Sequence, residues 1–397
     1  MNILIVASKF PPEYTGPGVR IPKLYKAITN DLGVKRLDVL CNGIEQTENE
    51  DYQYENFNVK RRVAGALRKN KTLLKLPKRI HSGLVNLVES IVTYKALKEH
   101  KHQIDLIHTL GTSGGTAAAL VWARKHNVPV LMELVTAQAI PVHKFMLLFK
   151  VRPPENTQII ALTKKAEKRC RALGFSEKQI WQRPNPINDK NFKIEGDKKL
   201  QYRETLSPFG SDDIVISTIG KMIPQKNHIL LVKALQYLPE RYKAIIAGPM
   251  IADGPLYARD KAYVETMGQL IGQHKLEGRV HMVLDFVNAA DYMKASDIYA
   301  MPAWNEGFGT PMIEAMACGL PVIANANEPA FCEWIINGEN GFLCDIDKPE
   351  EWAKAIERAA AIHEDKRREW ALKIKEKAGQ ETIFSEYVAR IRSLTEK

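Results

Sequence analysis

Short apolar runs rich in β-branched residues alternate along the chain with longer segments in which apolar residues recur every three or four positions. The short runs predict buried strands and the longer segments predict amphipathic helices, an alternation typical of βαβ units in parallel sheets. We expect strands at residues 3–7, 37–41, 106–108, 128–132 and 159–162 in the first half, and at 214–219, 244–247, 281–283, 298–301 and 322–324 in the second. The pattern therefore predicts an α/β fold with two doubly wound parallel sheets.

A segment rich in proline and polar residues separates the two sheets. Residues 183–188 read Arg-Pro-Asn-Pro-Ile-Asn, a sequence that breaks local structure, and we place a hinge within 185–210. We expect an amino-terminal domain at 1–190, a carboxyl-terminal domain at 191–380, and a final helix at 381–397 that crosses back onto the first domain.

The composition, with 45% hydrophobic and 26% charged residues, is that of an ordinary soluble protein. Five cysteines occur without a Cys-x-x-Cys pair, which favours a reducing compartment and argues against a zinc site. No basic segment precedes the apolar residues 3–7, so we interpret them as a strand and not as a secretion signal. No uncharged apolar stretch reaches 18 residues, so we expect no membrane span and a cytoplasmic location.

The net charge of +11 is concentrated in one segment. Residues 60–102 hold twelve lysines and arginines against two glutamates, which leaves a net charge of +10 there. Clustered charge of one sign suits an anionic partner, and residues 144–152 place apolar side chains between further cations. We therefore expect Lys60 to Lys101 and Lys144 to Arg152 to contact an anionic surface, the inner face of the cell membrane. The alternative is a solvated helix face.

Two loops at strand ends are candidates for binding phosphate, because ligands of open parallel sheets bind beyond the carboxyl ends of the strands. After the first strand, Gly16 and Gly18 leave backbone amides open at a predicted helix start, and Arg20 adds a charge. After strand 214–219, Lys221 and Lys226 suit a diphosphate. An ordinary turn and a pair of solvated lysines are the respective alternatives.

Residues 301–324 predict a strand end, a loop, a short helix and a second strand. Thr310 is expected to cap the helix with Pro311 at its first position, Gly319 to end it, and Val322 to open the next strand.

Two glutamates are then expected on one side of this stretch. Glu306 lies in the loop and Glu314 in the first turns of the helix, so both carboxylates can face one cleft, and Gly307 and Gly309 expose amides beside them. Either glutamate alone is explained by a solvated loop charge or a helix-dipole contact, whereas their joint spacing with the glycines indicates a ligand site.

At this point the sequence resembles family 4 of the retaining GT-B glycosyltransferases. The resemblance rests on EGFGTPMIEAMACGLPVIA with its two glutamates, on loop 220–226, on IIAGP at 245–249 and on NGENGFL at 337–343. It covers most of residues 214–346, and the amino-terminal half more loosely through PPEYTGPG. It implies two Rossmann-like doubly wound domains facing across a cleft, with the acceptor bound by the first and a nucleotide sugar by the second.

The resemblance also implies roles for single residues. Glu306 would bind hydroxyls of the donor sugar, Glu314 the ribose hydroxyls, and Lys226 the diphosphate. Lys221 stands where the family usually has arginine, which would form a two-pronged contact with phosphate. The backbone of the segment from Gly307 through Phe308 and Gly309 to Thr310, with Gly16 and Gly18 of the first domain, completes the expected donor contacts.

The acceptor side departs from the family. Many members carry a histidine soon after the strand written here at 128–132, but this chain has none before His143. The polar candidates on that side are Arg20, His108, Glu133, Thr136 and Gln138. A structural role is the alternative for His108.

The resemblance implies transfer of a hexose from a UDP- or GDP-linked donor with retention of configuration and without a metal ion or cofactor, the leaving phosphate accepting the acceptor's proton. The expected acceptor is a glycan or a polyprenyl-linked sugar in the synthesis of bacterial envelope polysaccharide. Two alternatives are a nucleotide-sugar epimerase of the same architecture and a non-enzymatic nucleic-acid-binding protein. Because no recognised nucleic-acid-binding motif occurs, we expect no nucleic-acid partner.

Overall fold

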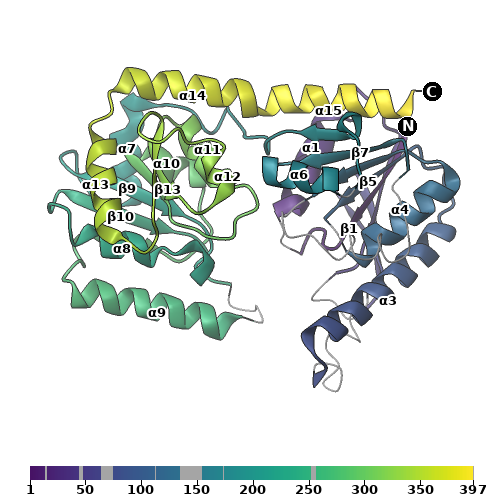
Figure 1. Cartoon of the computed structure of the whole chain (residues 1–397), viewed down its shortest axis with the longest axis horizontal. Coiled ribbons are helices and arrows are strands. Elements are labelled where there is room, and N and C mark those ends of the chain that lie inside the picture. Colours follow the sequence, from purple (N-terminus) through teal and green to yellow (C-terminus); the bar gives the residue numbers. More distant parts are fainter. Residues whose placement is uncertain are drawn as a thin grey trace. The chain divides into compact units, whose positions relative to one another are not determined.

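The chain forms two compact units, seen in a computed structural model that describes residues 1–13, 16–43, 48–63, 75–111, 113–134, 154–172, 174–251 and 256–396 (Figure 1). The amino-terminal unit contains Met1–Arg183 together with Ile383–Lys397, and the carboxyl-terminal unit contains Pro184–Thr382. The boundaries therefore fall a few residues from the expected positions 190 and 380.

The amino-terminal unit is built on an eight-stranded sheet of order β3-β4-β2-β1-β5-β6-β7-β8. Its strands are β1 Asn2–Ala7, β2 Arg36–Cys41, β3 Glu50–Tyr54, β4 Phe57–Arg61, β5 Leu106–Leu110, β6 Val130–Glu133, β7 Thr157–Ala161 and β8 Ile180–Gln182. Its helices are α1 Gly16–Ile28, α3 Lys78–Lys98, α4 Gly114–His126, α6 Lys164–Ala172 and most of α15 Gln380–Thr395, with the 3₁₀ turn η2 Glu177–Gln179. All neighbouring strands are parallel except β3 and β4, which form an antiparallel hairpin.

The carboxyl-terminal unit is built on a six-stranded parallel sheet of order β11-β10-β9-β12-β13-β14. Its strands are β9 Ile214–Ile219, β10 Tyr242–Ala247, β11 Val280–Val283, β12 Ile298–Met301, β13 Val322–Asn325 and β14 Gly341–Cys344. Its helices are α7 Lys199–Leu206, α8 Ile229–Leu235, α9 Tyr257–Gln273, α10 Ala289–Lys294, α11 Thr310–Ala317, α12 Pro329–Cys332, α13 Pro349–Ala360 and α14 Glu364–Ala378, with the 3₁₀ turns η3 Gly196–Lys198 and η4 Pro224–Lys226.

All ten expected strands are confirmed, and the sequence pattern missed four others. β3 is the edge strand and β4 lies next to it, and polar or charged residues interrupt both strands, so neither forms an apolar run. β8 and β14 are also outermost strands, of three and four residues, too short for a period to be visible.

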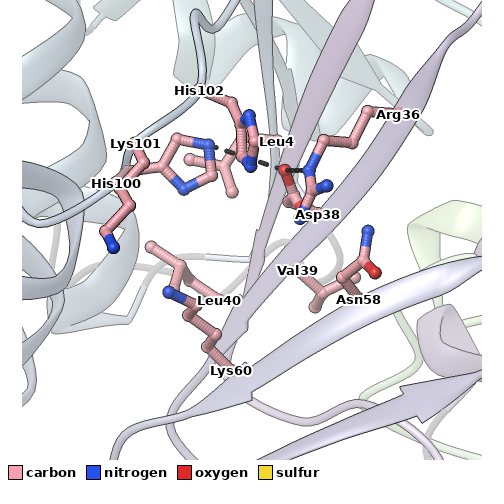
Figure 2. A pocket seen from close by; sticks show the side chains of 10 residues that line it. All are labelled: Leu4, Arg36, Asp38, Val39, Leu40, Asn58, Lys60, His100, Lys101 and His102. Atoms are coloured by element: carbon pink, nitrogen blue, oxygen red, sulfur yellow. Dashed lines mark hydrogen bonds and ion pairs between the residues drawn. The ribbon is translucent and has the colours of Figure 1, made fainter.

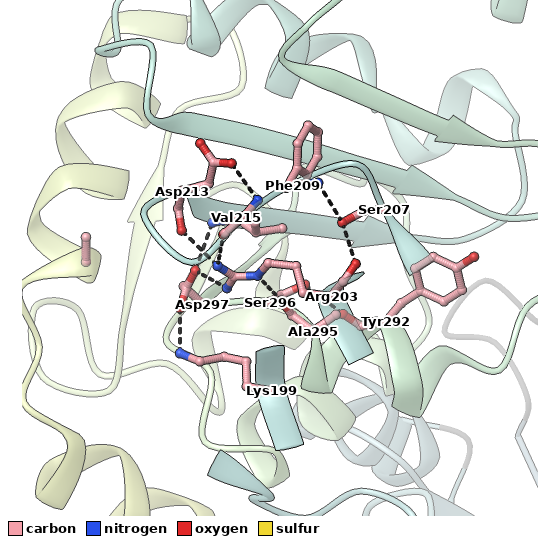
Figure 3. Close-up of polar contacts among 12 residues, drawn as sticks. Lys199, Arg203, Ser207, Phe209, Asp213, Val215, Tyr292, Ala295, Ser296 and Asp297 are labelled. Carbon is pink, nitrogen blue, oxygen red and sulfur yellow. Dashed lines mark hydrogen bonds and ion pairs between the residues drawn. The ribbon is translucent and has the colours of Figure 1, made fainter. Parts of the chain in front are cut away.

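A buried arginine fixes the segment that enters the carboxyl-terminal sheet (Figure 3). The Arg203 guanidinium from α7 donates to the Ala295 carbonyl over 2.9 Å and to Asp297 Oδ2 over 2.7 Å. Asp297 also accepts from Lys199 Nζ at 2.7 Å and from the Val215 amide at 2.9 Å. Because a buried charge must be paired, this cluster holds α7 against the amino ends of β9 and β12. The part of the expected hinge around α7 is thus anchored in the carboxyl-terminal unit.

The final helices each bury an apolar face. Trp352 and Ile356 of α13, Ile374 of α14 and Tyr387 of α15 are all buried, whereas Trp370 is half-buried. Among the described residues, no helix combines the length and apolarity needed to cross a bilayer.

Candidate active site

The loop after β9 is held close to the end of β10. Gly248, which follows β10, has a φ of 149°, and a Cβ atom there would lie 1.9 Å from the Gly220 carbonyl oxygen. Only glycine permits this approach. The chain then forms η4, and Asn227 adopts a left-handed φ of 53° before α8 begins at Ile229. The loop that carries both lysines therefore extends to His228, the residue before the helix.

The loop after β12 ends in the short helix α11. Gly309 takes the cap position with a φ of 83°, and a Cβ atom there would come within 2.5 Å of the Phe331 ring. Thr310 is therefore the first helical residue and not the cap, which corrects the expectation. Its hydroxyl accepts a hydrogen bond from Asn185 Nδ2 at 3.0 Å.

The other local predictions for this stretch are confirmed. α11 ends at Ala317, and Gly319 follows with a φ of 75°. Val322 opens β13. Phe308 is buried against the Trp334 ring, with their centroids 5.8 Å apart, so only its backbone is open to a ligand.

Lys226 and Glu306 meet between these two loops. The Lys226 ammonium donates to Glu306 Oε1 in an ion pair whose side chains are only 18% and 14% exposed. The loops are further joined because the Trp304 amide donates to the Gln225 carbonyl at 3.1 Å, and Gln225 Nε2 donates to the Asn305 carbonyl at 2.9 Å. A lysine and a glutamate 80 positions apart are thus held at the carboxyl ends of adjacent parallel strands.

Glu314 lies near the same place. Tyr299 of β12 is fully buried, and its hydroxyl donates to the Ile219 carbonyl at 3.2 Å. Burial raises the pKa of Tyr299 above its usual range, and the negative charges of Glu314 and Glu306 act in the same direction. Both carboxylates are therefore close enough to one buried hydroxyl to disfavour its ionisation. Glu314 itself is half-buried.

Three supporting residues of this site escaped sequence analysis. Glu328 Oε2 accepts from the Glu306 amide at 3.0 Å, and Asn325 Nδ2 donates to the Ala303 carbonyl at 3.1 Å, so the segment after β13 holds the glutamate loop. His228 is buried beside the lysine loop, and burial together with the charge of Lys226 lowers the pKa of His228 to about 3. The polar cluster Asn-Ala-Asn-Glu at a strand end was the available signal for the first two.

Within the described parts of the chain, no group of three or more His, Cys, Asp or Glu side chains is placed to hold a metal ion. A cavity of about 430 Å³ opens elsewhere in the carboxyl-terminal unit, lined by Lys294, Cys318, Leu320 and Arg367 among others. Because it lies at the carboxyl end of α11, whereas the glutamate loop precedes the amino end, it is separate from the Lys226–Glu306 site.

In the amino-terminal unit, Glu133 is the centre of a buried charged cluster. Its carboxylate pairs with Arg20, whose Nη1 lies 3.2 Å from Oε1, and with Arg183, whose Nη2 lies 3.0 Å from Oε1. It also accepts from the Tyr387 hydroxyl of α15, and His108 Nε2 lies 3.3 Å away. Burial alone would raise the pKa of Glu133, but the two guanidinium groups hold it well below its usual range.

This cluster corrects the expectation for two acceptor-side residues. Glu133 and His108 are both fully enclosed, so neither side chain is accessible to an acceptor in the structure. His108 Nδ1 lies 2.7 Å from the Tyr25 hydroxyl, and burial lowers the pKa of His108, which is therefore a neutral structural histidine. Arg20 belongs to the same cluster and keeps a side-chain exposure of 16%.

Four other candidates of this unit are less defined. Gly16 and Gly18 lie in the first turn of α1, where the amides of a helix start are found. Thr136 and Gln138 lie outside the described residues, as does the basic segment Lys144 to Arg152.

The cations of the segment from Lys60 to Lys101 that the structure describes do not lie on one surface. Lys60 and Lys101 line a cavity of about 70 Å³ on one face of the sheet, together with Arg36, Asp38 and His100 (Figure 2). Asp38 Oδ2 accepts from Arg36 Nε at 2.6 Å and lies 3.5 Å from His100 Nε2. Burial lowers the pKa of His100, although the charge of Asp38 opposes that shift.

Two more cations of this segment are paired. Arg61 is buried and its Nη1 bonds Glu50 Oε2 at 2.6 Å, while Arg62 Nη1 bonds Asp51 Oδ1 at 2.5 Å. The described cations of the segment that face solvent therefore include Lys75, which precedes α3, and Lys95 and Lys98 in its last turns.

A known protein family is similar to most of the carboxyl-terminal unit. Residues 204–377 match the family described as glycosyl transferases group 1. The D-inositol 3-phosphate glycosyltransferase of Rhodococcus opacus (strain B4) is 32% identical over 148 residues, which are 36% of this chain and 32% of that protein. The chain thus spans about a third of that relative's length. The UDP-Gal:alpha-D-GlcNAc-diphosphoundecaprenol alpha-1,3-galactosyltransferase of Escherichia coli is 24% identical over 289 residues, 69% of this chain and 71% of that protein.

Solved structures agree on the fold. HepE of Anabaena, in its complex with UDP and glucose, matches with a TM-score of 0.71 at 18% identity, over 99% of this chain and 100% of that chain. The fold is the expected GT-B arrangement of two parallel-sheet α/β domains. Residues 204–377, which match the glycosyl transferases group 1 family, include the Lys226–Glu306 pair and Glu314.

Proposed function

We propose that this protein is a glycosyltransferase that moves a hexose from a UDP- or GDP-linked donor to a glycan or polyprenyl-linked acceptor, with retention and without a metal ion. The observation that carries the proposal is the pairing of Lys226 with Glu306 at the carboxyl ends of β9 and β12, beside Glu314. Such strand ends are where open parallel sheets bind ligands. The family match over the same residues supports the assignment.

Binding of the donor would replace the Lys226–Glu306 ion pair with new contacts. A diphosphate arriving at Lys226 competes with Glu306 for the ammonium group, because both are anions seeking the same cation. Once released, the Glu306 carboxylate is free to accept hydrogen bonds from the sugar hydroxyls. Glu314 would hold the ribose hydroxyls, and Lys221 would add a second positive charge. The site is therefore expected to be neutral before the donor binds and rearranged afterwards.

The chemistry asked of these residues is chiefly electrostatic. Transfer with retention passes through an oxocarbenium-like state, in which charge builds on the departing diphosphate. Two lysines beside that diphosphate would stabilise the negative charge that develops on it. They would thereby take the role that a bound metal ion plays in other transferases. Since the Glu133 carboxylate is held ionised and enclosed, we propose that the leaving phosphate accepts the proton of the acceptor hydroxyl.

The acceptor is proposed from a relative. The Escherichia coli protein acts, by its name, on a diphosphoundecaprenol-linked sugar and takes galactose from UDP-Gal. We propose an acceptor of the same class for this chain, used in envelope polysaccharide synthesis at the cytoplasmic face of the membrane. The exposed lysines around α3, which are Lys75, Lys95 and Lys98, agree with a site of action near an anionic surface.

The proposal is tested by donor binding and transfer in sequence. Thermal-shift measurements against a panel of UDP- and GDP-sugars should find at least one stabilising donor, and Lys226→Ala should lose that shift. Lys233→Ala, an exposed lysine on α8, is the matched control and should behave like the wild type. Nuclear magnetic resonance of the product should show the donor's anomeric configuration, and EDTA should leave the rate unchanged. A donor converted to its epimer without any acceptor would refute transfer.

A further inference from the structure

The helix α3 carries an apolar stripe on its outer face. Ile80, Leu84, Leu87 and Ile91 are 53%, 38%, 49% and 58% exposed. Their spacing of four, three and four residues places them on one side of the helix. Four large apolar side chains in one line are unusual on a soluble surface, where exposed apolar residues are normally scattered singly.

The opposite face of α3 packs on the protein with both apolar and polar residues, and Val85, Ala96 and Leu97 are buried there. Glu89 and Thr93 are buried, and Thr93 Oγ1 accepts from Asn42 Nδ2 at 3.1 Å. Asn86 Oδ1 accepts from the Gly114 amide of α4 at 3.1 Å. Helix α3 therefore carries apolar side chains on its outer side as well as on its packed side, unlike an ordinary surface helix.

This orientation is fixed by close packing on α4, beside which α3 lies (Figure 1). A Cβ atom on Gly114 would lie 1.9 Å from the Asn86 carbonyl oxygen, and Ser90 Oγ donates to the carbonyls of Asn86 at 2.8 Å and Gly114 at 2.9 Å. Rotating α3 to bury the stripe would break these contacts. The stripe is thus available only to something outside the chain's own core.

Positive charge brackets the stripe. Lys75 precedes the helix and is exposed, and Lys95 and Lys98 are exposed on the turns that follow Ile91. Two acids accompany these cations: Glu89 is buried on the other face, and Glu99, just after the helix, lies 4.0 Å from Lys95 Nζ in an exposed ion pair. The outer face of α3 is therefore an apolar band of about 17 Å, at 1.5 Å per residue, with cations at both ends.

We propose that the outer face of α3 docks on an anionic lipid bilayer, with the stripe in the acyl boundary and the lysines against lipid phosphates. Apolar side chains flanked by an excess of Lys and Arg over acids are the pattern of helices that lie in a membrane interface. A second copy of the chain fits less well. An antiparallel pair of α3 helices would set Lys95 and Lys98 against the partner's Lys75, and a parallel pair would set each lysine against itself.

This surface goes beyond the proposed transfer and is tested without it. The purified full chain is mixed with vesicles of phosphatidylcholine alone, or with phosphatidylglycerol added at about a third of the lipid, and the bound fraction is measured by flotation. We expect binding to the anionic vesicles that weakens with salt, since the charge part is screened while the apolar part is not. Circular dichroism and thermal unfolding verify that each variant is folded.

Paired variants separate the two contributions. Leu87→Ser with Ile91→Ser should lower partitioning about tenfold or more, because apolar area no longer enters the bilayer. The matched control, Leu200→Ser with Leu372→Ser, alters exposed residues of the other unit and should change nothing. Lys95→Gln with Lys98→Gln should lower partitioning about fivefold per lysine and reduce its salt dependence.

Three outcomes would overturn the inference: no binding to anionic vesicles at low salt, equal effects of the stripe and control variants, or a concentration-dependent dimer that the stripe variant abolishes. Donor binding and transfer to a short soluble acceptor, measured in parallel, distinguish the two proposals. If a stripe variant still transfers sugar but no longer binds vesicles, the proposed function is unaffected. A protein that binds vesicles without transferring sugar leaves the docking surface in place.

Discussion

Replacing Glu306 with glutamine is the sharpest test of the site, because the change removes one charge and almost no volume. In the structure Lys226 is neutralised by Glu306, and both side chains are more than four-fifths buried. Glutamine leaves the ammonium without its counter-charge. A nucleotide diphosphate then no longer competes with the carboxylate for Lys226.

The variant should therefore bind the nucleotide more tightly while turning over more slowly. Exposed ion pairs contribute about 0–1 kcal/mol and breaking buried ones costs about 3–5 kcal/mol. A pair that keeps some contact with solvent falls between these limits, and we take about 1 kcal/mol, or about fivefold in Kd for UDP or GDP. Loss of a contact that strengthens in the transition state costs about 2.7–4 kcal/mol, a fall of about 100- to 1000-fold in kcat.

Calorimetric titration with the nucleotide diphosphate and steady-state kinetics with the nucleotide sugar measure the two effects separately. Glu357→Gln, an exposed glutamate on α13, is the matched control and should alter neither quantity. A Glu306→Gln enzyme with wild-type kcat, or one whose nucleotide binding weakens in step with kcat, would refute the partner exchange.

Three further predictions concern stability. Gly309→Ala should destabilise the carboxyl-terminal unit by at least about 1 kcal/mol, since its φ is 83° and a ring blocks the new methyl group, whereas Gly278→Ala has open space and should not; thermal unfolding compares them. Tyr387→Phe removes a buried donor to Glu133 and should cost the amino-terminal unit about 1–3 kcal/mol in urea unfolding; an unchanged midpoint would contradict the cluster. The pKa of His228 is about 3 in the folded chain against 6.5 when unfolded, so its contribution to the free energy of unfolding is complete above pH 6.5 and is lost as pH falls towards 3. His228→Gln should therefore flatten the fall of stability at low pH. Curves of stability against pH that run parallel for the variant and the wild type would exclude this effect.

The strand pattern and most of the local structure around α11 could be predicted from the sequence alone. Buried parallel strands are apolar on both faces, so each of the ten expected runs predicted a strand whose bounds are correct to within a few residues. Gly319 and Val322 marked their boundaries because helix ends and strand starts depend on the local backbone. Thr310 was misassigned because the contact that makes Gly309 the cap residue comes from Phe331, which lies outside the local window.

Which side chains meet was decided by the order of strands in each sheet. Lys226 and Glu306 are 80 positions apart and become neighbours because β9 and β12 are adjacent, which spacing along the chain cannot reveal. Glu133 was expected at an acceptor surface, yet it is buried. Tyr387, 254 positions later in the sequence, donates to its carboxylate, which also pairs with two arginines. The periodicity of α3 likewise contained its apolar line, but only packing on α4 determined that this line faces outward. Local sequence fixes backbone preference, whereas burial and pairing arise from distant segments that meet only in the folded chain.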